Sequence, residues 1–215
     1  MKVLVTGGMG FIGAAVVRAV LAQPDNQVVN LDKLTYAALP ERLATVDDDK
    51  RYEFVEVDIA DREAIGAVMS AHKLDAIIHL AAETHVDRSI DEPGAFIQTN
   101  ILGTFTLVEE AWGYWSSLAS EAQERFRFIH VSTDEVFGPA PPPESFSVYS
   151  PYRPSSPYAA SKAAADHLVR SWHRTYGFPA SVIHCANTYG PYQFPEKLIP
   201  LVTTRALRDE PLPIY

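Results

Sequence analysis

A glycine-rich turn directly after the first apolar segment constrains the fold of this chain more than any other feature. Residues 2–6 are a short apolar run, and Gly7-Gly8-Met9-Gly10-Phe11-Ile12-Gly13 follows with the spacing Gly-x-x-Gly-x-x-Gly. Residues 11–22 then show the spacing of a helix. A strand, a tight turn and a helix in this order let bare backbone approach a pyrophosphate at the positive end of the helix. The pattern predicts a dinucleotide site, and the alternative is a turn that is merely tight.

Further apolar segments predict the rest of an α/β fold. We expect strands at residues 27–31, 52–57, 75–80, 126–132 and 180–186, and helices at residues 61–72, 94–118 and 158–176. This alternation indicates a doubly wound parallel sheet with right-handed crossovers. Seven prolines within residues 138–157 instead indicate an irregular surface loop. A short helix that reaches about residue 209 is expected near the end of the chain.

Composition and charge argue against several classes of protein. The 215 residues are 47% hydrophobic, which is enough for one large domain or for one domain with part of a second. A formal net charge of -9 argues against a nucleic-acid partner, and no apolar run approaches the length of a membrane span. Cys185 is the only cysteine, so no intrachain disulfide can form and a reducing compartment fits. We therefore expect a cytoplasmic protein without membrane or nucleic-acid partners.

Two carboxylates follow predicted strands near the glycine turn. Asp32 ends the second predicted strand, 19 residues after Gly13, where it can accept hydrogen bonds from an adenosine ribose. This position favours NAD over NADP, although Lys33 follows it and a capping role is the alternative. Asp58 ends the third predicted strand, where it could face an adenine or cap a turn.

An acid pair and a tyrosine–lysine pair predict the chemistry. Tyr158 and Lys162 share a helix face one turn apart, so the ammonium can lower the pKa of the phenol and make it a usable base. Thr133, Asp134 and Glu135 follow an apolar strand, and these extra proton carriers favour elimination of water over simple hydride transfer. Two adjacent carboxylates in a low-dielectric site would titrate apart, so that one can hold a proton while the other is ionised. The alternative is a pair of solvent-facing acids at a strand end.

These features, together with Asn100, resemble the extended short-chain dehydrogenase/reductase family over the whole chain. Residues 32–37, 80–89, 132–138 and 189–200 are similar to the branch of that family that comprises nucleotide-sugar 4,6-dehydratases. The resemblance implies NAD as the cofactor and dTDP-glucose as the substrate. It also implies a homodimer in which two long helices of each copy form a four-helix bundle.

The resemblance gives each polar group a role. Tyr158 would take the proton of the sugar 4-hydroxyl while hydride leaves carbon 4 for NAD. Glu135 would remove the proton of carbon 5, and Asp134 would protonate the departing 6-hydroxyl before the hydride returns to carbon 6. Thr133 would hydrogen-bond near the sugar 4-oxygen, and Lys162 would bind the nicotinamide ribose.

The expected site extends along most of the chain. The expected cofactor residues are Gly7, Gly10, Phe11, Ile12, Gly13, Asp32, Lys33, Leu34, Thr35, Asp58, Ile59, Leu80, Ala81, Ala82, Thr84, Thr99, Tyr158, Lys162 and Thr188. The expected substrate residues are Thr84, Thr133, Asn187, Lys197, Leu198, Pro213, Ile214 and Tyr215. We expect no metal, because the histidines are not spaced as a ligand cluster and suit core or loop positions; they include His79, His85, His130 and His184.

We divide the chain into a Rossmann domain at residues 1–190, which carries the catalytic residues, and the start of an incomplete substrate-binding region at residues 191–215. By the resemblance, the smaller C-terminal substrate domain is largely absent from this chain. UDP-sugar dehydratases, epimerases and decarboxylases of the same fold are alternatives, and so is a noncatalytic NAD-binding protein. The Asp134–Glu135 pair disfavours an epimerase, which returns hydride to the same carbon and needs no acid for a leaving group.

Overall fold

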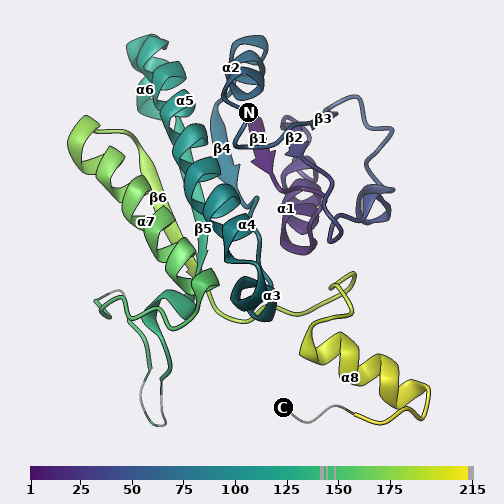
Figure 1. Cartoon of the computed structure of the whole chain (residues 1–215). Coiled ribbons are helices and arrows are strands. Elements are labelled where there is room, and N and C mark those ends of the chain that lie inside the picture. Colours follow the sequence, from purple (N-terminus) through teal and green to yellow (C-terminus); the bar gives the residue numbers. More distant parts are fainter. Residues whose placement is uncertain (141–142, 144, 148, 213–215) are drawn as a thin grey trace.

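A six-stranded parallel sheet forms the centre of the molecule in the computed structural model (Figure 1). The structure describes residues 1–140, 143, 145–147 and 149–212. The strand order is β3-β2-β1-β4-β5-β6, and every neighbouring pair is parallel. The strands are β1 (Lys2–Thr6), β2 (Gln27–Asp32), β3 (Tyr52–Glu56), β4 (Ala76–His79), β5 (Arg127–Thr133) and β6 (Ala180–Cys185). The predicted doubly wound sheet is confirmed.

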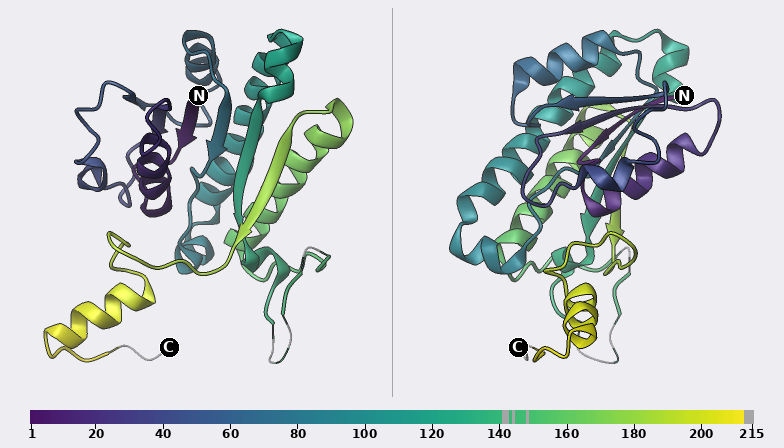
Figure 2. Two further views of the ribbon diagram at one scale, coloured as in Figure 1. Left: turned by 180° about the vertical axis from the view of Figure 1, so that it is seen from behind. Right: turned by 90° about the vertical axis from the view of Figure 1, so that its right-hand side faces the viewer.

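Helices cover both faces of the sheet (Figure 2). Helix α1 (Phe11–Leu21) lies on one face, and α2 (Arg62–Ala71), α5 (Thr104–Ser117) and α7 (Pro157–Tyr176) lie on the other. Alternate residues of β1 therefore enter two different cores. Val3 and Val5 pack with α1, whereas Leu4 packs in the cluster beneath α2, α5 and α7. Burial on both faces explains why the strands are apolar runs in place of alternating patterns.

The predicted helix at residues 94–118 is helical over nearly this length but is not one α-helix. It consists of α4 (Pro93–Phe96), a π-helix (Ile97–Gly103) and then α5. Gly103 faces residue 59 so closely that an added Cβ would lie 2.7 Å from the Ile59 Cγ1 atom. The short helices α3 (Val86–Asp91) and α6 (Ser120–Arg125) were not predicted, because six residues carry too little periodicity to identify a helix.

The polypeptide leaves the sheet after β6 and ends in a helix that is separate from the layers. An extended segment joins β6 to α8 (Leu198–Leu207), which lies beyond the carboxyl ends of the strands (Figure 1). Every described residue of α8 is at least partly exposed. Within the described ranges, no helix has the length and apolarity needed to cross a membrane.

The glycine turn brings three backbone segments into close contact. Gly7 has a φ of +75°, and an added Cβ would lie 2.7 Å from the Ala81 backbone nitrogen. At Gly13 an added Cβ would lie 2.1 Å from the Gly7 carbonyl oxygen. The first turn of α1 and the end of β4 can approach the turn this closely only because these positions carry no side chain.

Replacing Gly13 with alanine tests this packing. We expect Gly13→Ala to lower the free energy of unfolding by about 1–3 kcal/mol, because the methyl group would overlap the Gly7 carbonyl. The matched control is Gly113→Ala in α5, where an added Cβ meets no described atom within 4 Å. Since alanine is the better helix former, the control is expected to raise stability by roughly 0.5–1 kcal/mol. Urea denaturation measures both, and equal effects would refute the argument.

Candidate active site

A cavity of about 320 Å³ lies at the carboxyl ends of the strands. The chain reverses its winding between β1 and β4, and ligands of doubly wound sheets bind at such a point. The glycine turn, Asp32, Leu80, Thr133 and Cys185 bring the ends of five strands into the cavity wall. The volume falls in the range of small-molecule sites.

The structure brings most of the predicted residues together around this cavity. From the predicted catalytic set, Thr133, Glu135, Tyr158 and Lys162 line it. The other predicted residues that line it are Gly7, Gly10, Phe11, Ile12, Gly13, Asp32, Lys33, Thr35, Ile59, Leu80, Ala81, Ala82, Thr84, Thr99, Thr188, Asn187 and Lys197. Among the described residues, Leu34, Asp58, Asp134 and Leu198 were predicted and are not part of the lining. Pro213, Ile214 and Tyr215 lie outside the described residues.

Asp32 is fixed at the end of β2 by backbone donors. Its Oδ2 atom accepts a hydrogen bond from the Met9 amide at 3.0 Å, and Oδ1 accepts one from the Leu34 amide at 2.9 Å. Burial raises the pKa of the carboxyl group, and these hydrogen bonds and Lys33 oppose the rise. A carboxylate offers about four acceptor positions, so roughly two stay free for the hydroxyl groups of a ligand.

Asp58 contacts a lysine at the edge of the cavity. Lys33 Nζ lies 3.4 Å from Asp58 Oδ2 and donates a hydrogen bond to Thr99 Oγ1 at 2.9 Å. β3 ends at Glu56, so Asp58 lies beyond the strand that was expected to end with it. Its Oδ1 atom accepts a hydrogen bond from the Ala60 amide at 2.9 Å, which is the turn-capping role given as the alternative.

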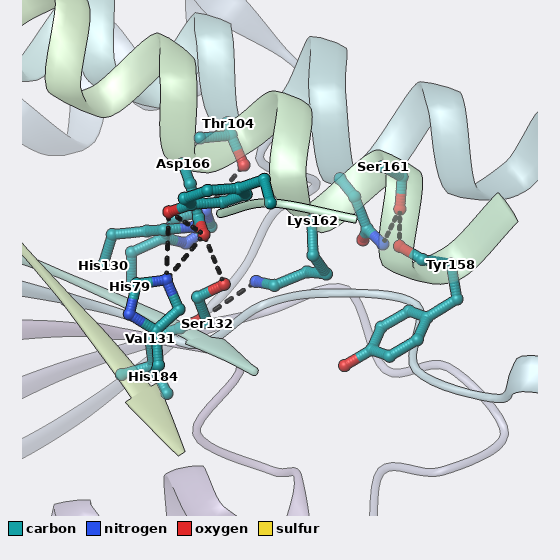
Figure 3. A network of polar contacts seen from close by, with 12 residues as sticks. His79, Thr104, His130, Val131, Ser132, Tyr158, Ser161, Lys162, Asp166 and His184 are labelled. Atoms are coloured by element: carbon teal, nitrogen blue, oxygen red, sulfur yellow. Dashed lines mark hydrogen bonds and ion pairs between the residues drawn. The ribbon is translucent and has the colours of Figure 1, made fainter. Parts of the chain in front are cut away.

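Tyr158 and Lys162 enter the cavity from the first turns of α7. Ser156 caps this helix by accepting a hydrogen bond from the Ala159 amide at 3.0 Å. Tyr158 is 8% exposed and Lys162 is 4% exposed. Lys162 Nζ donates to the Val131 carbonyl oxygen at 2.8 Å, so the ammonium lies against β5 (Figure 3).

The pKa of Tyr158 moves in the direction opposite to the one predicted. Burial raises it well above the ordinary phenol value, the carboxylates of Glu135 and Asp134 add to the rise, and a hydrogen bond with Thr133 opposes it. Burial also lowers the pKa of Lys162 to about 8. In this structure, burial and nearby negative charge raise the pKa of the phenol, so the predicted lowering of that pKa is wrong.

Thr133 organises the acid pair. Its hydroxyl oxygen accepts from the Glu135 amide at 3.2 Å, and the hydroxyl donates to Asp134 Oδ1 at 3.4 Å. The 3₁₀ turn Asp134–Phe137 then places Glu135 in the cavity wall. Burial raises the pKa of Glu135, Asp134 raises it further, and Lys197 lowers it. This rise runs against the prediction that Glu135 is the readily ionised partner.

Asn100 joins the cavity wall to the start of α7. Its side chain accepts from the Glu83 amide at 2.8 Å and donates to the Glu83 carbonyl at 2.9 Å. It also donates to Ser161 Oγ at 2.9 Å, and Ser161 in turn donates to the Tyr158 carbonyl at 2.7 Å. The π-helix thereby fixes the helical turn that carries Tyr158. The family resemblance included Asn100 but gave it no specific role.

Arg42 is a buried residue of the site that sequence reasoning missed. Its side chain donates to the carbonyl oxygens of Met9 at 2.9 Å, Ala37 at 2.7 Å and Tyr192 at 3.0 Å. Arg18 lies over the Tyr192 ring at 5.8 Å from the centroid. These contacts tie the glycine turn to the crossing segment, which we define as residues 189–197. The four-residue 3₁₀ turn that carries Arg42 has no periodicity by which to find it.

The crossing segment closes one side of the cavity. Gln193, Phe194, Glu196 and Lys197 contribute to the lining. The Phe194 ring meets the Tyr36 ring edge-on with centroids 5.6 Å apart. Lys197 Nζ also lies 3.4 Å from the Thr84 carbonyl oxygen.

A parallel sheet in this order, with a glycine turn and a Tyr-x-x-x-Lys pair at the same cavity, defines a Rossmann-like protein of the short-chain dehydrogenase/reductase type. Residues 4–215 match the family model described as GDP-mannose 4,6 dehydratase. The chain belongs to this family.

Individual relatives are similar over the whole chain. A dTDP-glucose 4,6-dehydratase from Escherichia coli is 55% identical, and one from Neisseria meningitidis is 56% identical; each alignment covers 100% of this chain. The chain spans 62% and 61% of their respective lengths. A Streptomyces venezuelae dTDP-glucose 4,6-dehydratase solved with NAD bound has 45% identity and a TM-score of 0.90, over 100% of this chain and 65% of that one. A Bacillus anthracis dTDP-glucose 4,6-dehydratase in complex with NAD has 38% identity and a TM-score of 0.88, over 100% and 64%.

Removing the Arg42 guanidinium tests the link between the glycine turn and the crossing segment. We expect Arg42→Met to lower the free energy of unfolding by about 2–4 kcal/mol, since three carbonyl groups lose a charged donor. Amide hydrogen exchange in residues 189–197 should accelerate as well. The control is Arg174→Met at an exposed position of α7, which is expected to change stability by less than about 0.5 kcal/mol. Unchanged exchange in Arg42→Met would contradict the link.

The raised pKa of Glu135 predicts a pH-dependent effect on stability. A group with a raised pKa in the folded state stabilises the fold while it is protonated, and this contribution is lost as pH rises through the folded pKa. Glu135→Gln removes the ionisation, so its stability relative to the wild type should increase from about pH 4 to about pH 7. Thermal or urea unfolding at several pH values measures the difference. The increase must exceed that of the exposed control Glu121→Gln, and a flat difference would count against the raised pKa.

Proposed function

We propose that this chain binds NAD and dehydrates a nucleotide-activated hexose, dTDP-glucose, to the 4-keto-6-deoxy sugar. The observation that carries the proposal is the convergence of Glu135, Tyr158 and Lys162 on one cavity with the glycine turn. Similarity to dTDP-glucose 4,6-dehydratases at 55% identity supports the choice of substrate. We assign residues 1–190 to the Rossmann domain and residues 191–215 to the start of a substrate-binding region.

The residues of the cavity fit NAD. Added Cβ atoms would fill the cradle at Gly7 and Gly13, which therefore leaves bare backbone for a pyrophosphate at the N-terminus of α1. Asp32, at the end of β2, keeps acceptor capacity for a ribose. Lys162 and Tyr158 line the part of the same cavity that lies beside β5. When bound, NAD would accept the hydride of carbon 4 and return it to carbon 6.

The side chains divide the proton transfers among themselves. Tyr158 takes the proton of the sugar 4-hydroxyl, for which its phenol must first ionise; the Lys162 ammonium and the positive charge of a bound nicotinamide ring would lower the pKa that burial raises. Thr133 lies within hydrogen-bonding reach of the phenol to orient it. Glu135, in its ionised form, removes the proton of carbon 5, which the 4-keto group has made acidic, and returns it to carbon 5 when the carbon 5–carbon 6 double bond is reduced. Asp134 delivers a proton to the departing 6-hydroxyl, for which it must turn toward the substrate because it does not line the cavity here. Lys162 holds the ribose beside the reacting carbon.

The acid pair also separates this proposal from an epimerase. An epimerase has no leaving group to protonate, so a glutamate in the cavity wall with a second acid beside it would have no task there. We further propose that α5 and α7, which lie side by side on one face of the sheet, form the predicted homodimer with the same helices of a second copy (Figure 2). This last proposal rests on the family resemblance.

An activity assay with the purified chain tests the proposed function. We expect dTDP-glucose and NAD to give a 4-keto-6-deoxy sugar, detected by its absorbance in alkali. Glu135→Gln should lower kcat by at least about 100-fold because the carbon-5 base is lost. Glu121→Gln, on α6 and remote from the cavity, is the matched control and should retain the rate. Inversion at carbon 4 would support an epimerase, and NAD binding without turnover would support a noncatalytic protein.

A further inference from the structure

A fully buried carboxylate lies behind Lys162 and has no task in the proposed mechanism. Asp166 is on α7 one helical turn after Lys162, and it is 0% exposed. Polar side chains from β5, β6 and the proline-rich loop surround it (Figure 3). The contacts to its Oδ2 atom are Ser132 Oγ at 2.9 Å, His184 Nε2 at 3.0 Å and Tyr152 Oη at 3.1 Å, and His130 Nε2 lies 3.2 Å from Oδ1.

Lys162 and Asp166 contact adjacent residues of the same strand. Lys162 donates to the Val131 carbonyl at 2.8 Å, and Asp166 accepts from the hydroxyl of Ser132. Residues four apart on a helix share a face, so both charges point from α7 onto β5. Figure 3 shows Lys162 between Tyr158 and the polar cluster around Asp166. Both charges are removed from water, which is costly for either one alone.

The two fully buried histidines, His130 and His79, do not supply the opposite charge. Burial lowers the pKa of His130 to about 4, and burial, His130 and Lys162 hold the pKa of His79 well below its ordinary value. Both imidazoles are therefore neutral near neutral pH. The hydrogen bonds that Asp166 accepts hold its pKa far below the usual range, against the effect of burial.

Lys162 needs a nearby negative charge, because burial disfavours its ammonium form. Burial is the largest influence on its pKa and lowers it, and the charge of Asp166 is the first influence that opposes this change, followed by Cys185. The titratable groups that face the pair come from every element packed against it: Tyr158 from α7, His79 from β4, His130 from β5, His184 and Cys185 from β6, and Tyr152 from the loop.

We propose that Asp166 is the positioning residue that keeps Lys162 as an ammonium at the cavity. Three hydrogen-bonding groups at Oδ2 fix the carboxylate one helical turn from Lys162. Its negative charge stabilises the ammonium across this turn, while the ammonium itself donates to the Val131 carbonyl of β5. The contribution of Lys162 to catalysis rests on the proposed function, whereas its charge state does not. Asp166 touches neither substrate nor cofactor in this assignment and acts only through the lysine.

The charge state of Lys162 can be measured without turnover. The protein is labelled with ¹³C at the lysine ε-carbons, and the signal of Lys162 is assigned by its loss in Lys162→Arg. We expect the NMR titration midpoint of Lys162 to fall by about one pH unit or more in Asp166→Asn. Tyr152→Phe is the matched control, because it removes a hydrogen bond to Asp166 and keeps the charge. An unchanged midpoint in Asp166→Asn would overturn the proposal.

A second measurement covers the case in which Asp166→Asn does not fold. In that case the double variant Lys162→Met/Asp166→Asn, which removes both charges, should fold again. If the double variant also fails to fold, Asp166 has a structural role that is independent of Lys162 and the proposal is refuted.

Kinetics then connect the charge state to the reaction. The alkaline limb of the kcat profile should move to lower pH in Asp166→Asn and return toward the wild-type position in Asp166→Glu. If the wild-type protein is inactive and the Lys162 midpoint still falls in Asp166→Asn, the proposed function is refuted and the assignment of Asp166 stands. If the wild-type protein is an active dehydratase and the Lys162 midpoint is unchanged in Asp166→Asn, the assignment of Asp166 is refuted and the proposed function stands.

Discussion

The close backbone approach between the glycine turn and the end of β4 is the contact on which the rest of the site depends. At Gly7 no atom larger than hydrogen fits against Ala81, and at Gly13 none fits against the turn itself. β1 and β4 pair in register up to Thr6 and His79, so both strands end at the level of this contact, and the cavity lies at their carboxyl ends. The side chains from β2, β5 and α7 are then positioned around this fixed backbone corner.

Buried polar groups are the second organising element, and they follow one rule at several places. Arg42 and Asp32 satisfy backbone groups around the glycine turn, Asn100 satisfies the backbone of Glu83, and Asp166 collects side-chain donors beneath the catalytic helix. Each is nearly excluded from water, with exposed fractions of 8% or less. A buried group with several partners loses all of them at once if it moves, so these residues confer rigidity where the proposed chemistry needs fixed distances.

Sequence reasoning found the fold and most of the cavity because local signals identify them. A glycine turn between an apolar strand and a helix, and a tyrosine–lysine pair at helical spacing, can both be recognised without three-dimensional information. The contacts that join distant segments gave no such signal. His130 lies 36 residues before Asp166, and His184 lies 18 residues after it. The parallel pairing of β5 with β6 and the packing of α7 on these strands bring the three residues together. The direction of the Tyr158 pKa was missed for the same reason, since it depends on burial and on the approach of Glu135.

The hydrogen bonds of Arg42 have a mechanical consequence. The Arg42 guanidinium donates to the carbonyls of Met9 and Tyr192, which belong to the glycine turn and to the crossing segment. The crossing segment cannot move outward unless the buried Arg42 loses a hydrogen-bond acceptor. The glycine turn likewise cannot shift without weakening the contact that holds the crossing segment. Entry and release of a molecule bound between the two segments would therefore require the Arg42 hydrogen bonds to break. The residence time of such a molecule would depend on how often these hydrogen bonds break, as well as on the strength of the molecule's own contacts.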